Sequence, residues 1–305
     1  MPRSSGAGKN VRVDELIANR RRPLFSVELW PPRSAASEER LKGALDELSH
    51  YALDFASITY GAGGSTREFT HELVVHLHRN FGLVPVAHLV TAAHSRADLE
   101  HILARYAAEG IENVLALRGD PPLDSAAELA AGDLKYAIDL ARLASGSYGM
   151  CVGVAAHPEG HPEATSFETD MDFLAAKLEV ADFAISQFFY TADQFFRLRD
   201  ALDKRGVAKP LIPGIMAPTS LSTLRRMAEL SGTTIPDGTV ARLSRYEGDP
   251  AGFIAEGTQI AIELASQVLE AGAVGIHVYT MNQAKTTIAI YEALYGNSWT
   301  GVAST

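Results

Sequence analysis

The sequence contains one cysteine, Cys151, among 305 residues. An internal disulfide is therefore excluded, and the apolar run MCVGVAA around this residue favours a small buried side chain in a reducing compartment. No run of about 18 apolar residues occurs, and the N-terminal stretch MPRSSGAGKN has no apolar core of the kind that a secretory signal needs. We therefore expect a cytoplasmic protein that has no membrane partner.

Basic residues are fewer than acidic residues in this sequence. Lysine and arginine total 27 against 37 aspartate and glutamate residues, which gives a formal net charge of −10. Such a surface repels phosphate backbones and anionic lipid head groups, so we expect no nucleic acid partner. The hydrophobic content of 47% is enough for a large globular core. A homo-oligomer remains open on this evidence.

Short apolar runs rich in β-branched residues alternate along the chain with longer stretches at helical spacing, as in strands that feed crossover helices. The predicted strands are Leu24–Leu29, Phe55–Tyr60, Val84–Val90, Asn113–Leu117, Val152–Ala156, Phe183–Phe189, Leu211–Ile215 and Val274–Tyr279. The predicted helices include Ser37–Leu48, Thr66–Phe81, Ala97–Ala108, Asp172–Glu179 and Leu221–Leu230. This pattern predicts an α/β protein with a single (β/α)8 TIM barrel.

The spacing after the seventh predicted strand is longer than elsewhere and holds two further helical patterns, Pro236–Tyr246 and Pro250–Glu270. We interpret them as an extra helical elaboration between strands 7 and 8. Residues 1–11 are expected to form a flexible N-terminal tail, and residues 12–305 the catalytic barrel. An open doubly wound sheet is the alternative fold, but no G-x-G-x-x-G turn follows the first strand.

Polar side chains stand at the carboxyl ends of nearly all the predicted strands, the edge where barrel enzymes place their chemistry. They are Glu28, Thr59, His88, Arg118, Asp120, His157, Gln187 and Tyr279. Strand ends that serve packing alone would more often carry apolar or turn residues. The sequence therefore predicts a polar active site at this rim.

Two acids at this rim stand out. Glu28 lies between apolar residues in SVELWPPR, where desolvation should raise the pKa of its carboxyl group and make it a proton donor. Asp120 follows a strand directly in LRGDPP and should stay ionised beside a developing cation. The alternatives are a salt bridge from Glu28 to a neighbouring strand and a simple helix or turn cap at Asp120.

Two other motifs carry less weight. The glycine-rich segment GAGGS at residues 61–65 is a weak signal for phosphate binding. His157 and His161 have a metal-like spacing, but Pro158 and Pro162 prevent the regular helix that would bring both imidazoles onto one face. We therefore expect no metal site.

Taken in order, the motifs resemble the catalytic barrel of the methylenetetrahydrofolate reductase family over about residues 12–296. They are SVELWPPR, SITYGAGGS, AHLV, ALRGDPP, AAHPEGHPEA, ISQFFY, IPGI and HVYTMN. The resemblance implies reduction of methylenetetrahydrofolate to methyltetrahydrofolate in one-carbon metabolism, with NADH or NADPH as hydride source and FAD as cofactor. The chain ends soon after the eighth predicted helix, so we expect no S-adenosylmethionine-binding regulatory domain of the eukaryotic kind.

The resemblance also implies roles for individual residues. Glu28 matches the acid that opens the folate ring, Asp120 the stabiliser of the resulting cation, and Gln187 the glutamine that contacts pterin or nicotinamide. The positions that match the flavin site are Thr59, Tyr60, His88, Arg118, Gly119, Asp120, His157, His161, Asp170 and Lys177. The positions that match the substrate site are Gln187, Leu221, Tyr279 and Gln283.

Several of these positions depart from the family pattern, and most face the flavin. His157 stands where the family usually has tyrosine, and Phe173 and Ala176 replace an asparagine and an arginine near the flavin phosphates. A lost arginine removes a bidentate phosphate contact that Lys177 alone does not reproduce. The stretch AAELAAGDL has no aromatic residue for the adenosine end. We hypothesise weak or absent FAD binding and direct hydride transfer to the folate. The alternative is that FAD is retained, with His157 stacking as the tyrosine would and with Lys177 and helix N-termini holding the phosphates.

The folate side also differs, with Leu221 in place of phenylalanine and Gln283 in place of arginine. A second hypothesis is a folate- or nucleotide-binding sensor without turnover, for which an acid such as Glu28 inside an apolar strand would have no purpose. A third is another flavin barrel, such as a proline-oxidising enzyme, which would more often place cations to bind a substrate carboxylate.

Overall fold

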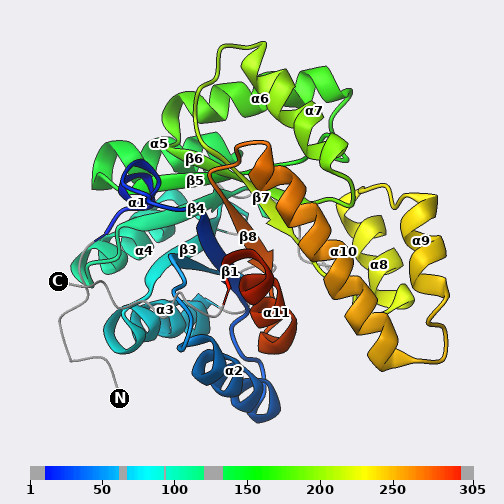
Figure 1. The fold of residues 1–305 in the computed structure, drawn as a ribbon. Helices are drawn as coiled ribbons and strands as arrows, with labels where there is room; N and C mark the ends of the chain where they lie inside the picture. Colours follow the sequence, from blue (N-terminus) through cyan, green and yellow to red (C-terminus); the bar gives the residue numbers. More distant parts are fainter. Residues whose placement is uncertain (1–10, 62–66, 93, 120–132, 297–305) are drawn as a thin grey trace.

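Eight parallel strands close into a barrel in the order of the chain, with β1 paired to β8. The computed structural model describes residues 11–61, 67–92, 94–119 and 133–296. The strands are β1 (Leu24–Leu29), β2 (Phe55–Ile58), β3 (Val84–Val90), β4 (Asn113–Leu117), β5 (Cys151–Ala156), β6 (Phe183–Phe188), β7 (Leu211–Ile215) and β8 (Gly275–Tyr279). The predicted TIM barrel is confirmed (Figure 1).

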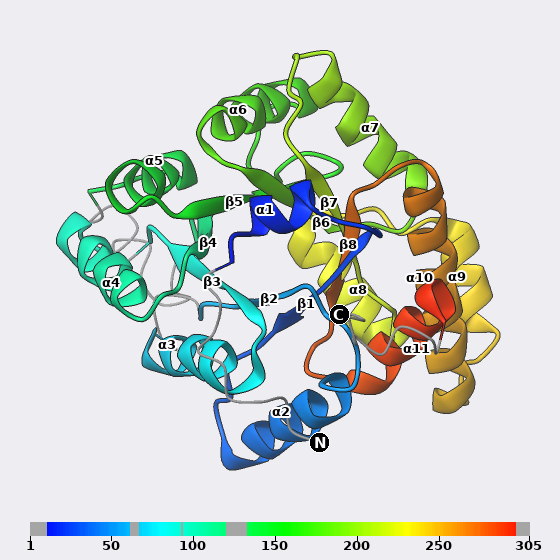
Figure 2. The same ribbon diagram turned by 60° about the vertical axis from the view of Figure 1, so that its left-hand side comes forward.

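The helices surround this barrel (Figures 1 and 2). They are α1 (Val13–Ala18), α2 (Ala35–Leu48), α3 (Arg67–His76), the π-helix η2 (Leu77–Phe81), α4 (Arg96–Ala108), α5 (Ala137–Tyr148), α6 (Phe167–Val180), α7 (Ala192–Asp203), α8 (Leu221–Ser231), α9 (Asp237–Ser244), α10 (Pro250–Glu270) and α11 (Ala284–Tyr295). Among the described residues, none of these helices has both the length and the apolar character needed to cross a membrane.

Three predicted boundaries were wrong for local reasons. The second strand ends at Ile58 and not at Tyr60, whose side chain instead bonds to His94 outside the barrel wall. Helix α6 begins at Phe167 rather than at Asp172 because the side chain of Ser166 caps its first turn. The stretch predicted as one helix over residues 66–81 turns into a π-helix after His76, a change that helical periodicity does not reveal.

The amino-terminal end of the barrel is closed by α1, which lies across it in Figure 2. Val13 and Ile17 are buried and pack in one cluster with residues from the beginnings of the strands, among them Leu24, Phe55 and Val86. The sequence did not indicate this helix, because six residues are too few to show helical periodicity.

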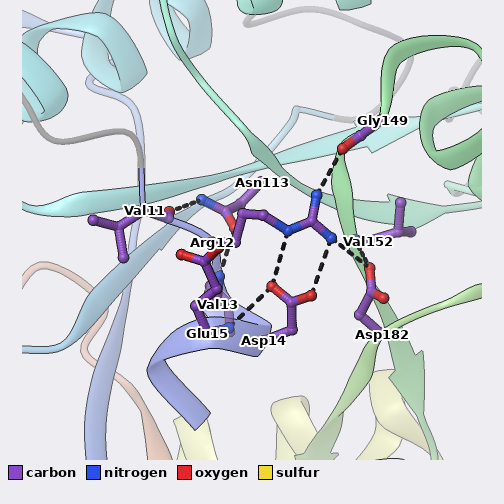
Figure 3. Close-up of polar contacts among 9 residues, drawn as sticks. All are labelled: Val11, Arg12, Val13, Asp14, Glu15, Asn113, Gly149, Val152 and Asp182. Carbon is purple, nitrogen blue, oxygen red and sulfur yellow. Dashed lines mark hydrogen bonds and ion pairs between the residues drawn. The ribbon is translucent and has the colours of Figure 1, made fainter. Parts of the chain in front are cut away.

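Arg12, Asp14, Asn113 and Asp182 form a cluster of polar contacts, here called the polar latch, that holds α1 in place (Figure 3). The guanidinium of Arg12 donates to both carboxylate oxygens of Asp14 at 3.1 and 3.0 Å and to the carbonyl oxygen of Gly149 at 2.6 Å. Its Nη2 also lies 3.7 Å from Asp182 Oδ2. Asn113 accepts a bond from the Val13 amide and donates one to the carbonyl oxygen of Val11, at 2.8 and 2.9 Å.

Cys151 begins β5 beside this latch and is fully buried, as its apolar surroundings predicted. Burial raises the pKa of its thiol, so the group stays protonated. Asp14, Cys151 and Asp182 offer ligand atoms within 4.8 Å of one another. The guanidinium of Arg12 lies within ion-pair distance of both carboxylates, at 3.0 Å from Asp14 and 3.7 Å from Asp182, so we interpret this cluster as a structural ion-pair network.

Candidate active site

A cavity of about 220 Å³ opens among residues from the carboxyl ends of the strands. It is lined by Glu28, Trp30, His88, Leu115, Leu117, Ala155, His157, Ile185, Gln187, Phe188, Met216, Met227, His277, Tyr279 and Met281. Five of the predicted rim residues therefore meet in one place, namely Glu28, His88, His157, Gln187 and Tyr279. Thr59 and Arg118, also predicted at the rim, are not among the residues that line this cavity.

Glu28 lies in the wall of this cavity with 12% of its side chain exposed. Burial raises the pKa of its carboxyl group to about 7, although a hydrogen bond of 3.1 Å from the indole Nε1 of Trp30 to Oε1 acts in the opposite direction. The direction of the shift agrees with the prediction from the apolar strand. At neutral pH a large fraction of Glu28 is protonated and able to donate.

His88 faces Glu28 from β3, with its Nε2 atom 3.8 Å from Glu28 Oε2. Burial lowers the pKa of this imidazole to about 3, so His88 is neutral and does not form an ion pair with the carboxylate. On the neighbouring strands β2 and β8, no described residue forms an ion pair with Glu28, and the contact to His88 comes from β3. His88 Nε2 is buried, and within the described ranges it has no hydrogen-bond partner.

His277 lies deeper, between two buried serines that the sequence analysis did not single out. Its Nδ1 is 2.8 Å from Ser26 Oγ and its Nε2 is 3.1 Å from Ser57 Oγ. Because the Ser26 hydroxyl donates to the carbonyl oxygen of Ile276 at 3.0 Å, Nδ1 must be the donor to Ser26, and Ser57 donates to Nε2. Burial lowers the pKa of His277 to about 3, which keeps it neutral.

Tyr279 and Gln187 complete the polar part of the wall. The Tyr279 hydroxyl donates to the carbonyl oxygen of Ser186 at 2.8 Å, and burial together with the Glu28 charge raises its pKa well above the usual range. Gln187 Oε1 accepts a bond of 3.0 Å from the amide of Phe188. This bond orients the amide group of Gln187 at the cavity.

The two cations predicted for the flavin site, Arg118 and Lys177, have protein partners. Arg118 Nη1 donates to Glu163 at 2.5 Å. Lys177 Nζ donates to the carbonyl oxygen of Ala155 at 2.9 Å, and burial lowers the pKa of its amine. In the described part of the chain, the side chains of Arg118 and Lys177 are thus each bonded to a protein group.

The other predicted flavin positions are held by local contacts. The rings of His157 and His161 meet edge to face with centroids 4.8 Å apart, and burial lowers the pKa of His157 to about 3. Asp170 accepts a bond of 3.0 Å from the His161 amide. Thr59 follows β2, and its carbonyl oxygen accepts a bond from the hydroxyl of Thr70.

Gly119 is required for a geometric reason. Its φ is +80°, and a Cβ atom there would lie 2.8 Å from Val90 Cβ, so any larger residue would be strained and would clash. Tyr60, on the neighbouring loop, bonds through its hydroxyl to His94 Nε2 at 3.0 Å. Both residues shape the backbone beside the cavity.

Of the predicted substrate positions, Leu221 and Gln283 lie at helix starts outside the described cavity lining. Leu221 is the first residue of α8 and packs against the cluster that contains Met216, while Gln283 precedes the first residue of α11. Asp120 lies outside the described residues, so its predicted place opposite Glu28 remains a prediction.

Comparison with known proteins supports a family assignment. The family model described as methylenetetrahydrofolate reductase matches residues 12–295. The 5,10-methylenetetrahydrofolate reductase of Pectobacterium carotovorum is 32% identical, over 88% of this chain and 89% of the relative. The corresponding Escherichia coli protein is 31% identical, over 88% and 90%. Methylenetetrahydrofolate reductase (NADH) 1 of Arabidopsis thaliana is 31% identical, over 91% of this chain and 50% of the plant protein.

A solved structure has the same fold at low sequence identity. It is an uncharacterized protein from Clostridium thermocellum that binds two copies of 5-methyl-5,6,7,8-tetrahydrofolic acid, and it matches with a TM-score of 0.63 at 13% identity, over 92% of this chain and 96% of that one. The family model spans nearly the whole barrel, including the strand ends that form the cavity. The chain belongs to the methylenetetrahydrofolate reductase family.

Proposed function

We propose that this protein reduces methylenetetrahydrofolate to methyltetrahydrofolate with NADH or NADPH as the hydride source, and that Glu28 is the acid. The observation that carries the proposal is a carboxyl group with a pKa of about 7 in the wall of the barrel cavity. An acid with a pKa near the working pH is the most effective proton donor. His88 and His277 are neutral neighbours, so neither withdraws the proton.

The chemistry balances with one proton and one hydride. Glu28 gives its proton to the bridging folate nitrogen, the bond from that nitrogen to the methylene carbon breaks, and the carbon remains as an iminium cation on the other nitrogen. Hydride from the dihydronicotinamide ring then reduces this carbon to a methyl group. The Glu28 carboxylate recovers a proton from water. Gln187 orients the pterin or the nicotinamide, and Asp120 stabilises the cation.

We propose further that FAD is held weakly or not at all, and that hydride passes directly from the nicotinamide to the folate. A tightly held dinucleotide needs cations directed at its phosphates. Arg118 instead bonds to Glu163, and Lys177 is buried against the carbonyl oxygen of Ala155. Phe173, at a position where the family has a phosphate-side polar residue, is 64% exposed. These residues do not fit a tightly bound FAD.

One purification tests both proposals. We expect freshly purified protein to lack a flavin absorbance spectrum and to oxidise NADH when methylenetetrahydrofolate is added, at a rate that added FAD leaves unchanged. A stoichiometric flavin spectrum that survives dialysis would overturn direct transfer. Absence of turnover with NADH and with NADPH, with and without FAD, but with retained folate binding, would favour the non-catalytic sensor.

A further inference from the structure

Trp30 follows β1 two residues after Glu28, and alternation along the chain places both side chains on the cavity side. The indole Nε1 donates to Glu28 Oε1 at 3.1 Å. An indole N–H is a donor only, so this contact has one direction. Trp30 therefore donates a hydrogen bond to Oε1 of the Glu28 carboxyl group and none to Oε2.

The backbone around this pair is held by the loop after β8. The Trp30 amide donates to Asn282 Oδ1, and Asn282 Nδ2 donates to the carbonyl oxygen of Trp30, both at 2.9 Å. The hydroxyl of Thr280 donates to the carbonyl oxygen of Glu28 at 2.6 Å and accepts a bond from the Asn282 amide. Asn282 adopts a φ of 55°, a conformation that needs such support.

The proline pair that follows Trp30 restricts it to an extended conformation. Trp30 is 38% exposed, so burial in the core does not explain why the residue is held beside Glu28. The loop contacts and the prolines together fix the backbone from which the indole extends. The hydrogen bond to Glu28 Oε1 then holds the ring itself against the carboxyl group.

The second oxygen of Glu28 has different surroundings. Glu28 Oε2 lies 3.8 Å from His88 Nε2, too far for a hydrogen bond, and among the described residues Nε2 has no hydrogen-bond partner. The other titratable groups of the cavity wall in that part of the chain are His157, His277 and Tyr279. All three are neutral at physiological pH, because burial lowers the pKa of both imidazoles and raises that of the phenol, so no described charge competes with the indole.

From this geometry we infer that Trp30 is a positioning residue for Glu28: its indole N–H occupies Oε1 as an acceptor and leaves Oε2 as the oxygen that carries and delivers the proton. The inference rests on the proposed role of Glu28 as the acid. A carboxyl group that accepts a bond at one oxygen holds its proton on the other. The same bond stabilises the carboxylate that remains after proton transfer.

The first test replaces Trp30 by phenylalanine, which keeps an aromatic ring and removes the N–H. Because the protonated form is active, reductase activity falls as pH rises through the pKa of Glu28. Loss of a donor to the carboxylate should raise that pKa and move the alkaline limb of kcat upward by about 0.5 to 1 pH unit. The higher pKa alone would raise the protonated fraction at neutral pH, by about twofold at most. We nevertheless expect kcat at neutral pH to fall about three- to tenfold, because the carboxyl group loses its orientation and the carboxylate left after proton transfer loses its donor, while the folate KM changes by less than about twofold.

The second test needs no turnover and separates this inference from the proposed function. The protein has two tryptophans, Trp30 and Trp299, so the Trp299→Phe variant reports on Trp30 alone. Its emission should change with an inflection near pH 7 as the neighbouring carboxyl group ionises. Adding Glu28→Gln, which keeps an acceptor oxygen but does not titrate, should abolish the inflection.

The outcomes are distinct. An inflection that is unchanged in Glu28→Gln, or a pH profile of Trp30→Phe that coincides with the native profile, would overturn the role of Trp30. An inflection that depends on Glu28, in a protein without reductase activity, would support the hydrogen bond between Trp30 and Glu28 and would overturn the proposed function. If Trp30→Phe fails to fold, the fluorescence titration of the Trp299→Phe variant still decides.

Discussion

Glu28 Oε2 and His88 Nε2 face each other across 3.8 Å, and both side chains are neutral between about pH 3 and pH 7, because burial lowers the pKa of His88 to about 3 and raises that of Glu28 to about 7. This pair resembles an ion pair in its geometry and differs from one in its charge. Burial shifts the pKa of each group towards the neutral form, because neither has a charged partner that would offset desolvation. Ionisation of either side chain therefore lowers the stability of the folded protein.

The first prediction follows from the raised pKa of Glu28. The pKa rises from 4.5 to about 7 on folding, so between these values the folded state holds a proton that the unfolded state has released. Stability is therefore lost as pH increases across this window, by up to roughly 3 kcal/mol above pH 7. Glu28→Gln has no such cost, and we expect it to exceed the native protein in free energy of unfolding at pH 8.

Urea denaturation at pH 4.5 and pH 8 measures this difference. The advantage of Glu28→Gln should be large at pH 8 and small at pH 4.5, while its reductase activity falls by about 10²- to 10⁴-fold. A variant that is equally stabilised at both pH values would show that Glu28 does not titrate in this range. Retained activity would remove Glu28 from the mechanism.

The second prediction concerns Lys177, which the family resemblance assigns to the flavin phosphates and which here bonds to the carbonyl oxygen of Ala155. Burial lowers the pKa of its amine below 10.5. The folded state thus binds fewer protons than the unfolded state at pH values between the lowered pKa and 10.5, and stability rises with pH there. Relative to Lys177→Met, the native protein should gain stability as pH approaches 10.5.

The control is Lys42→Met on α2. Lys42 pairs with Glu38, which raises the pKa of its amine, so the difference between native and variant should change with pH in the opposite direction. FAD titration of both variants checks the proposed absence of a phosphate contact. A strong loss of FAD affinity confined to Lys177→Met would restore the flavin role to this residue.

The barrel and most of its polar rim were predictable because they follow from local pattern. Parallel strands covered on both faces appear as continuous apolar runs, and a polar residue at the end of such a run is visible in one sequence. Glu28 and Gln187 were found this way. Trp30 and His277 were missed, although each lies two residues from a predicted site residue, Glu28 or Tyr279, and alternation alone would have found them.

Other features depend on contacts between distant residues and leave no local signal. The bond from Arg118 to Glu163 joins residues 45 positions apart, and the bond from Lys177 to Ala155 crosses from α6 to β5. Both bonds engage a cation that the family resemblance had matched to the flavin site. The residues could be named from the motifs, but their protein partners required the folded structure.

The third prediction tests how closely the cavity wall is packed. A Cβ atom at Gly214 would lie 2.2 Å from the carbonyl oxygen of Ser186, which accepts the Tyr279 hydroxyl bond, and 2.6 Å from Tyr279 Cε2. Gly214→Ala must therefore displace β6 or the tyrosine ring. We expect a loss of about 2–4 kcal/mol in free energy of unfolding, together with weakened folate binding.

The matched substitution is Gly43→Ala in the middle of α2, where a Cβ atom would meet nothing within 4 Å. It should stabilise the protein by about 0.5–1 kcal/mol, because alanine restricts the unfolded chain and favours the helix. Chemical denaturation of both variants gives the comparison. Equal free energies of unfolding for Gly214→Ala and Gly43→Ala would mean that the residues around Gly214 move aside at little energetic cost.

The last prediction separates the two ends of the barrel. Asn113 is 1% exposed and makes two bonds that hold α1, accepting from the Val13 amide and donating to the Val11 carbonyl oxygen. Asn113→Ala leaves both backbone groups without these partners, at a cost of about 2–4 kcal/mol. Asn80→Ala, which removes an exposed bond to His76, should cost under about 0.5 kcal/mol.

Because the cavity lies at the opposite end of the strands, the folded fraction of Asn113→Ala should retain native kcat and KM. A loss of kcat beyond the loss of folded protein, measured by urea titration alongside the NADH assay, would show that the latch of α1 also governs the active cavity.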